Sequence, residues 1–127
     1  MKYLGIDYGS KFVGIAISDD DGSFAFPKTV VATKDAIKTI QMLVTQENVG
    51  TIVIGESVAS NGVQNDVAQA VRQYAKKIEQ ATGIVVTFQR EDFSSVEAHR
   101  YQVDSGRRDD SAAAIILQRF LDRQKRS

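Results

Sequence analysis

Four carboxylates, Asp7, Glu56, Glu91 and Asp109, each lie where a predicted strand ends or a predicted helix begins. If the strands that precede the first three are neighbours, these residues fall on one edge of a sheet, where ligands of open α/β sheets collect. Carboxylate oxygens that converge there would bind a hard divalent cation, most simply Mg²⁺ or Mn²⁺. Two such ions about 4 Å apart can activate a water and stabilise the leaving oxygen of a phosphodiester. The set therefore predicts metal-dependent hydrolysis of phosphodiester bonds.

Each of these carboxylates also has a purely structural interpretation. Asp7 can cap its own turn, Glu56 can cap the loop that follows it, and Glu91 can pair with the adjacent Arg90 or with a nearby lysine. Asp109 can cap the last helix, where the macrodipole favours an acidic residue. The metal-site hypothesis therefore depends on the coincidence of the four positions and not on any one of them.

The elements that would position Asp7 are two short apolar strands, at residues 3–6 and 12–17, joined by the turn at residues 7–11. Gly9 is predicted to supply the positive φ that such a turn usually requires. Gly5 and Gly14 lie inside the two strands and predict close approach of another backbone or of a ligand.

The remaining pattern alternates strands and helices. Residues 23–31 are predicted to form an edge strand because Pro27 cannot donate to a ladder on both sides. A helix capped by Thr33 runs to about residue 47, and Gly50 ends that unit. The β-branched run at residues 51–55 predicts a central strand buried on both faces, which delivers Glu56.

A helix with one apolar face is predicted next, followed by a strand at residues 84–88 that delivers Arg90-Glu91-Asp92. Gly83 ends this helix. Ser94 and Ser95 have capping-box spacing for a short helix, which favours capping over nucleophilic catalysis. The last helix follows Asp109. The apolar face of the helix before Gly83 comprises Val67, Val71, Tyr74, Ala75 and Ile78.

This order predicts an α/β fold with a five-stranded mixed sheet and helices on both faces. The three N-terminal strands should be antiparallel, and the strands joined through helices should be parallel with right-handed crossovers. The length of 127 residues fits one domain spanning residues 1–127.

Composition narrows the classes of function. The absence of cysteine excludes thiol chemistry, and a single histidine, His99, excludes a histidine-rich metal cage. His99 itself is predicted to be a surface residue. The 16 basic and 16 acidic residues cancel, so bulk charge gives no argument for a nucleic-acid partner. No long apolar run or leader is visible, which predicts a cytoplasmic protein with no membrane partner.

Several motifs together resemble the YqgF/RuvX family of Holliday junction resolvase-like proteins, which are regarded as pre-16S rRNA nucleases. The resemblance covers nearly the whole chain. The opening motif alone is shared with ATPases of the actin and sugar-kinase type, whereas the ordered set is specific. The motifs are LGIDYGSK at residues 4–11, VGIAIS at 13–18, IVIG at 52–55, Glu91 with SSVEA at 94–98, and Asp109 with AAAIILQ at 112–118.

The resemblance implies an RNase H-like fold and a nuclease whose catalytic residues are Asp7, Glu91 and Asp109. Asp7 would bridge two magnesium or manganese ions, Glu91 and Asp109 would each complete one, and Glu56 would be a ligand or an outer-shell partner. Asp110 is the neighbour that could substitute for Asp109.

Two motifs depart from the family pattern. The family has Asp-Glu-Arg where this chain has Arg90-Glu91-Asp92, so only Glu91 carries over. The family usually has Gly-Leu-Pro where this chain has Gly55-Glu56-Ser57. In related junction resolvases the central strand delivers a glutamate, and Glu56 could restore that arrangement.

The expected partner is nucleic acid, either structured RNA or branched DNA, while the oligomeric state is left open by the sequence. Four basic residues, Lys11, Arg90, Arg107 and Arg108, are candidates for contacts to backbone phosphates, which position a substrate without reading its sequence.

Two alternative functions remain. One is a catalytically inactive RNase H-like module that binds nucleic acid or protein, given the altered motif at Glu91. The other is an ATP-dependent phosphotransfer domain, which the turn after Asp7 suggests. That alternative lacks a second domain to close over a nucleotide and a Walker-type lysine loop.

Overall fold

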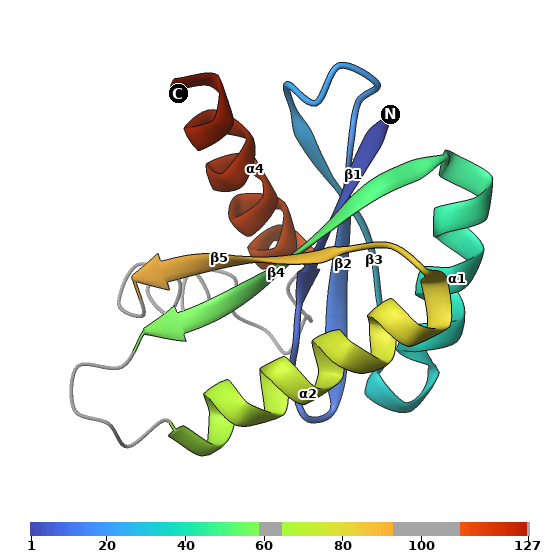
Figure 1. Ribbon diagram of the computed structural model, residues 1–127, viewed down its shortest axis with the longest axis vertical. Helices are drawn as coiled ribbons and strands as arrows, with labels where there is room; N and C mark the ends of the chain where they lie inside the picture. Colours follow the sequence, from blue (N-terminus) through green and yellow to red (C-terminus); the bar gives the residue numbers. More distant parts are fainter. Residues whose placement is uncertain (59–64, 93–109, 127) are drawn as a thin grey trace.

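The computed structural model describes residues 1–58, 65–92 and 110–126. Five strands form one sheet, α1 and α2 cover one face of it, and α4 crosses the other (Figure 1). In chain order the elements are β1 Lys2–Asp7, β2 Phe12–Ser18, β3 Ala25–Ala32, α1 Thr33–Glu47, β4 Val49–Val58, α2 Asn65–Thr82, β5 Val86–Asp92 and α4 Asp110–Arg126.

The strand order in the sheet is β3-β2-β1-β4-β5. The β1–β2 and β2–β3 pairs are antiparallel, whereas β4 pairs in parallel with both β1 and β5. The predicted mixed sheet is therefore confirmed. Pro27 lies in the edge strand β3, as predicted, and the β2–β3 register shifts beside it, between Ile15 and Ala16.

Two apolar clusters hold the layers together, one on each face of the sheet. The α1/α2 core includes Leu4, Ile6, Ile52, Ile54, Ile40 and Ile78. The α4 core comprises Ala16, Val53, Ala113, Ile116, Leu117 and Leu121. Because β4 supplies residues to both clusters in alternation, it is buried on both faces, as its continuous β-branched run predicts.

The close approach predicted at Gly5 is present and involves α4. A Cβ atom at this glycine would lie 2.7 Å from the Cβ of Leu117 and 3.0 Å from the carbonyl oxygen of Ala113. Gly55 in β4 meets the same helix, since a Cβ there would lie 2.5 Å from Cδ1 of Ile116. Absence of side chains at Gly5 and Gly55 allows α4 to lie directly on β1 and β4.

Three local predictions differ from the structure. Gly9 does not have a positive φ. A side chain would not fit at this position, because a Cβ would lie 2.5 Å from the carbonyl oxygen of Phe12. The left-handed residue that ends α1 is Asn48, with φ of 55°, and not Gly50. The N-cap of α1 is Ala32, so Thr33 is the first helical residue and does not cap the helix.

The strand β5 also begins and ends later than predicted. It runs from Val86 to Asp92, so Arg90, Glu91 and Asp92 lie within the strand instead of following it. The helix predicted after Ser94 lies outside the described residues. None of the helices in the described ranges has the length and apolar character needed to cross a bilayer.

Candidate active site

Asp7 is the last residue of the central strand β1 and belongs to the face that α4 covers. On this face Tyr3 meets Phe120, with ring centroids 6.0 Å apart, and Gly5 meets Leu117. Successive positions on β1 therefore meet progressively earlier residues of α4. Side chains alternate along a strand, so Asp7 is the next position on that face and lies level with the first turn of α4.

Glycines flank Asp7 on both neighbouring strands. Gly14 of β2 is its direct pairing partner, and Gly55 of β4 follows the Ile6–Ile54 pair. Paired residues present their side chains on the same face of a sheet. The two strands that flank the half-buried Asp7 therefore contribute no side chain larger than hydrogen at these two positions, and Ile116 of α4 packs over Gly55.

The turn after Asp7 is held by α1 and α2. The Thr33 hydroxyl donates to the carbonyl oxygen of Gly9 at 2.6 Å, and the Thr33 amide donates to the carbonyl oxygen of Lys11 at 2.9 Å. The Tyr8 ring packs on Tyr74 of α2 with centroids 4.6 Å apart. The turn that follows Asp7 is thus held by two helices that cover the same face of the sheet, opposite the face of α4.

Tyr74 is a buried residue whose hydroxyl has no hydrogen-bond partner among the described residues. Burial, and to a smaller extent the neighbouring Tyr8, raises the pKa of Tyr74 to about 12. The phenol is therefore neutral at physiological pH and acts as a packing group beneath the turn.

Glu56 is not brought together with Asp7. Gly55 faces α4, so the next residue, Glu56, faces α2, where its Oε2 accepts a hydrogen bond from Nε of Arg72 at 3.2 Å. Arg90 is the register partner of Glu56 and is exposed. In this structure Glu56 is therefore the partner of Arg72 on the face opposite Asp7, and its predicted role as a metal ligand stays untested.

Of the other predicted ligands, Glu91 lies in β5 and pairs with Ser57 of β4. Asp109 lies outside the described residues, and α4 begins at the next residue, Asp110. Within the described part of the chain, no group of three or more acidic or histidine side chains is arranged to hold a metal ion. The donor set that the sequence predicts consists wholly of carboxylate oxygens, which fits magnesium or manganese by chemistry.

Among the predicted phosphate contacts, Lys11 is exposed in the turn directly after Asp7. Arg107 and Arg108 lie outside the described residues, as do His99, Ser94 and Ser95. Lys11 is thus the one predicted cation that the described structure places beside the end of β1.

Sequence reasoning missed the residues that support the turn. The sequence predicts that Thr33 caps a helix, whereas its hydroxyl bonds to a turn 24 residues earlier in the chain. The sequence predicts only that Tyr74 belongs to an apolar helix face, and nothing in its spacing indicates contact with Tyr8. Gly14, which the sequence predicts as a point of close approach, is the direct pairing partner of Asp7.

The order of the strands and the carboxylate at the end of the first strand define the RNase H-like class of α/β proteins. A solved structure of RuvC from Thermus thermophilus in complex with a Holliday junction substrate has a TM-score of 0.63 to this chain at 14% identity. The structural match covers 98% of this chain and 96% of the RuvC chain. The fowlpox virus Holliday junction resolvase has a TM-score of 0.53 at 13% identity, over 97% of this chain and 99% of that one.

The sequence itself gives the family. A family model described as "RuvX: Holliday junction resolvase" matches residues 1–123, so the chain belongs to the RuvX family. Relatives from Lawsonia intracellularis and Maridesulfovibrio salexigens, both named "Putative pre-16S rRNA nuclease", are 34% and 35% identical to it. They cover 98% and 97% of this chain and 96% and 99% of their own length. The protein is a nuclease, a hydrolase that acts on phosphodiester bonds.

Proposed function

We propose that this protein is a metal-dependent nuclease for structured RNA that processes the 5′ end of pre-16S rRNA. The observation that carries the proposal is the position of Asp7. Its carboxylate ends the central strand, lies level with the start of α4, and has a glycine on each neighbouring strand. The names of full-length relatives supply the substrate class.

In this proposal Asp7, Glu91 and Asp109 hold two magnesium or manganese ions. The parallel β1–β4 and β4–β5 pairs support the grouping of Asp7 and Glu91, because parallel neighbours end at the same edge of the sheet. Asp109 directly precedes α4, whose first turn is level with Asp7. When bound, the ions would activate a water and stabilise the leaving oxygen.

The remaining residues of the site would position the substrate. Lys11, in the turn after Asp7, is suited to contact a backbone phosphate, and Arg107 and Arg108 precede Asp109 in the sequence. Such contacts contribute affinity without base specificity. Thr33 and Tyr8 would act indirectly, because they fix the turn that carries Asp7 and Lys11.

The test is cleavage of a labelled RNA that spans the 5′ leader and mature start of 16S rRNA. Wild-type protein should cleave it with Mg²⁺ or Mn²⁺ and not with EDTA. The variant Asp7→Asn should lower the rate by at least about 100-fold, because it weakens metal binding. Asp21→Asn, which makes the same chemical change at an exposed turn position, is the matched control and should cleave normally.

Metal-independent binding of this RNA with no cleavage by wild-type protein would exclude the proposal and favour a non-catalytic binding module. Branched DNA is the second candidate substrate, which the description of the family model supports. A labelled four-way DNA junction assayed in parallel separates the two, since the proposal expects faster cleavage of the RNA.

A further inference from the structure

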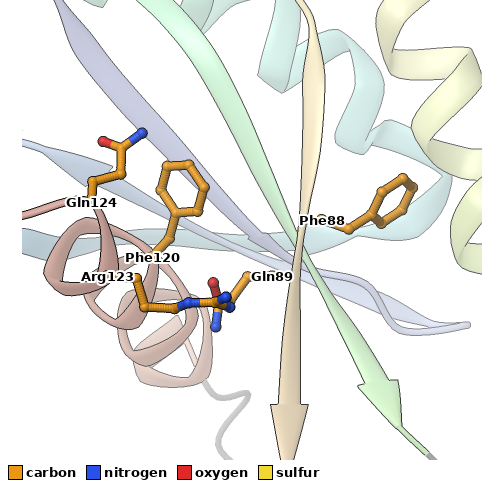
Figure 2. Close-up of a pocket in the computed structure, with 5 residues that line it drawn as sticks. All are labelled: Phe88, Gln89, Phe120, Arg123 and Gln124. Carbon is orange, nitrogen blue, oxygen red and sulfur yellow. The ribbon is translucent and has the colours of Figure 1, made fainter. Parts of the chain in front are cut away.

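A pocket of about 260 Å³ lies between α4 and the edge strand β5. It is lined by Phe88, Gln89, Phe120, Arg123 and Gln124. Figure 2 shows Arg123 extending from α4 toward Gln89 of β5, with the Phe120 ring beside them and the Phe88 side chain on the other side of the strand. The walls therefore combine an aromatic ring, a guanidinium group and two amides.

Two of these walls are held in place by the fold. The Phe120 ring packs against Tyr3 in a tilted arrangement and joins the α4 core. Gln89 is only 4% exposed, and its Nε2 donates to the carbonyl oxygen of Arg90 at 3.1 Å. A fixed ring and a fixed amide cost little conformational entropy when a ligand binds, which is the general basis of preorganised recognition.

The chemistry of the walls fits one nucleotide. An aromatic ring stacks any base, a glutamine amide can hydrogen-bond to a base edge, and the permanently charged guanidinium of Arg123 suits a phosphate. The volume is below the roughly 300–1,000 Å³ of pockets for drug-sized ligands, so it suits a single extruded base and not a duplex.

The pocket is close to the proposed catalytic residue. Gly55 pairs with Gln89 and is adjacent to Asp7 across the β1–β4 pair, so the three residues follow one another across neighbouring strands. With strands about 4.8 Å apart, Gln89 is about 10 Å from Asp7 along this row, or about three stacked nucleotides. Because Ile116 of α4 covers Gly55 in the middle of this row, an RNA strand at Asp7 would pass around α4 to reach the pocket.

We infer that this pocket binds one unpaired nucleotide of the RNA substrate, away from the bond that is cleaved. The base stacks on Phe120, the Gln89 amide contacts its edge, and Arg123 contacts a phosphate. This inference rests on the proposed RNA substrate. It predicts that the protein prefers RNA in which a single-stranded segment adjoins a helix over RNA that is wholly double-stranded.

The test measures binding, by fluorescence anisotropy in EDTA, of a labelled RNA hairpin with a four-nucleotide tail and of the same hairpin without the tail. Arg123→Gln should weaken binding of the tailed hairpin by about 10-fold, the loss typical of a charged hydrogen bond, and barely affect the blunt hairpin. Lys77→Gln, which removes one charge from an exposed position on α2, should affect both RNAs equally and weakly.

An abasic nucleotide in the tail tests stacking without relying on a variant to fold. Wild-type protein should lose at least about 5-fold in affinity when the stacked base is removed, whereas Phe120→Leu should bind intact and abasic tails alike. Equal loss on tailed and blunt hairpins for Arg123→Gln, or no abasic effect in wild type, would overturn the inference. Tail-specific effects without metal-dependent cleavage would instead refute the proposed nuclease substrate and leave the pocket standing.

Discussion

The hydroxyl of Thr33 donates a 2.6 Å hydrogen bond to the carbonyl oxygen of Gly9 and joins the start of α1 to the turn after Asp7. The backbone amide of Thr33 bonds to Lys11 in the same turn. A single residue therefore fixes the loop between the predicted metal ligand Asp7 and the exposed Lys11. The role of Thr33 is positioning, since it supports the loop from the opposite side and is not itself predicted to touch substrate.

Replacing Thr33 by valine should lower both stability and activity. Val keeps the shape but leaves the Gly9 carbonyl without this donor, which should reduce the free energy of unfolding by about 1 kcal/mol. The variant should have a higher KM and a lower kcat, because Asp7 and Lys11 shift when the turn loses this hydrogen bond. Thr39→Val is the matched control, since the Thr39 hydroxyl is exposed and makes only a 3.4 Å bond within α1. Denaturant unfolding and cleavage kinetics that match between the two variants would contradict this role.

Gly55→Ala should be destabilising by about 1–3 kcal/mol because the new methyl group meets Cδ1 of Ile116. Ile116→Val removes that atom, so the double variant should lose less stability than the sum of the single losses. Gly5→Ala should not be relieved in this way, because its obstacles are the Leu117 Cβ and a backbone oxygen. A double-mutant cycle from denaturant unfolding measures the difference, and strict additivity at Gly55 and Ile116 would show that the clash is absent.

Glu56→Gln should leave metal-dependent cleavage close to the wild-type rate. The Glu56 carboxylate bonds to Arg72 on the α2 face, whereas Asp7 belongs to the α4 face. Because the Arg72 side chain is 63% exposed, loss of this ion pair should cost at most about 1 kcal/mol. Rates and apparent metal affinities of Glu56→Gln and Asp7→Asn should be compared under one set of conditions. A Glu56→Gln variant as impaired in metal affinity as Asp7→Asn would establish Glu56 as a ligand.

Tyr74→Phe should raise stability, by about 1 kcal/mol, because it removes a buried hydroxyl that has no hydrogen-bond partner among the described residues. The gain should increase in alkaline solution. The pKa of Tyr74 is raised from 10.0 to about 12, so between these values the unfolded chain loses a proton that the folded chain keeps, and the wild-type protein loses stability. Unfolding measured at pH 7 and pH 11 checks this, and a stability difference that does not grow with pH would contradict it.

Most of the elements, and the antiparallel or parallel direction of the strands, could be predicted from the residues alone. Residues 51–55 read as a doubly buried strand because both faces of β4 contact a core, and Pro27 read as an edge residue because it cannot pair on both sides. These signals are local, since burial imposes periodicity on the residues of one element. The position of Asp7 at the end of the first strand followed from the same reasoning, whereas the central place of that strand in the sheet came from the structure.

The contacts between side chains of different elements could not be predicted in this way. The face on which Glu56 lies depends on β4 continuing in register through residue 58, and a strand that stopped at Gly55 would have left the direction of Glu56 undefined. The Thr33–Gly9 bond and the pocket between Gln89 and Arg123 join segments that are distant along the chain. Such contacts follow from the relative placement of helices and strands, which no local periodicity encodes.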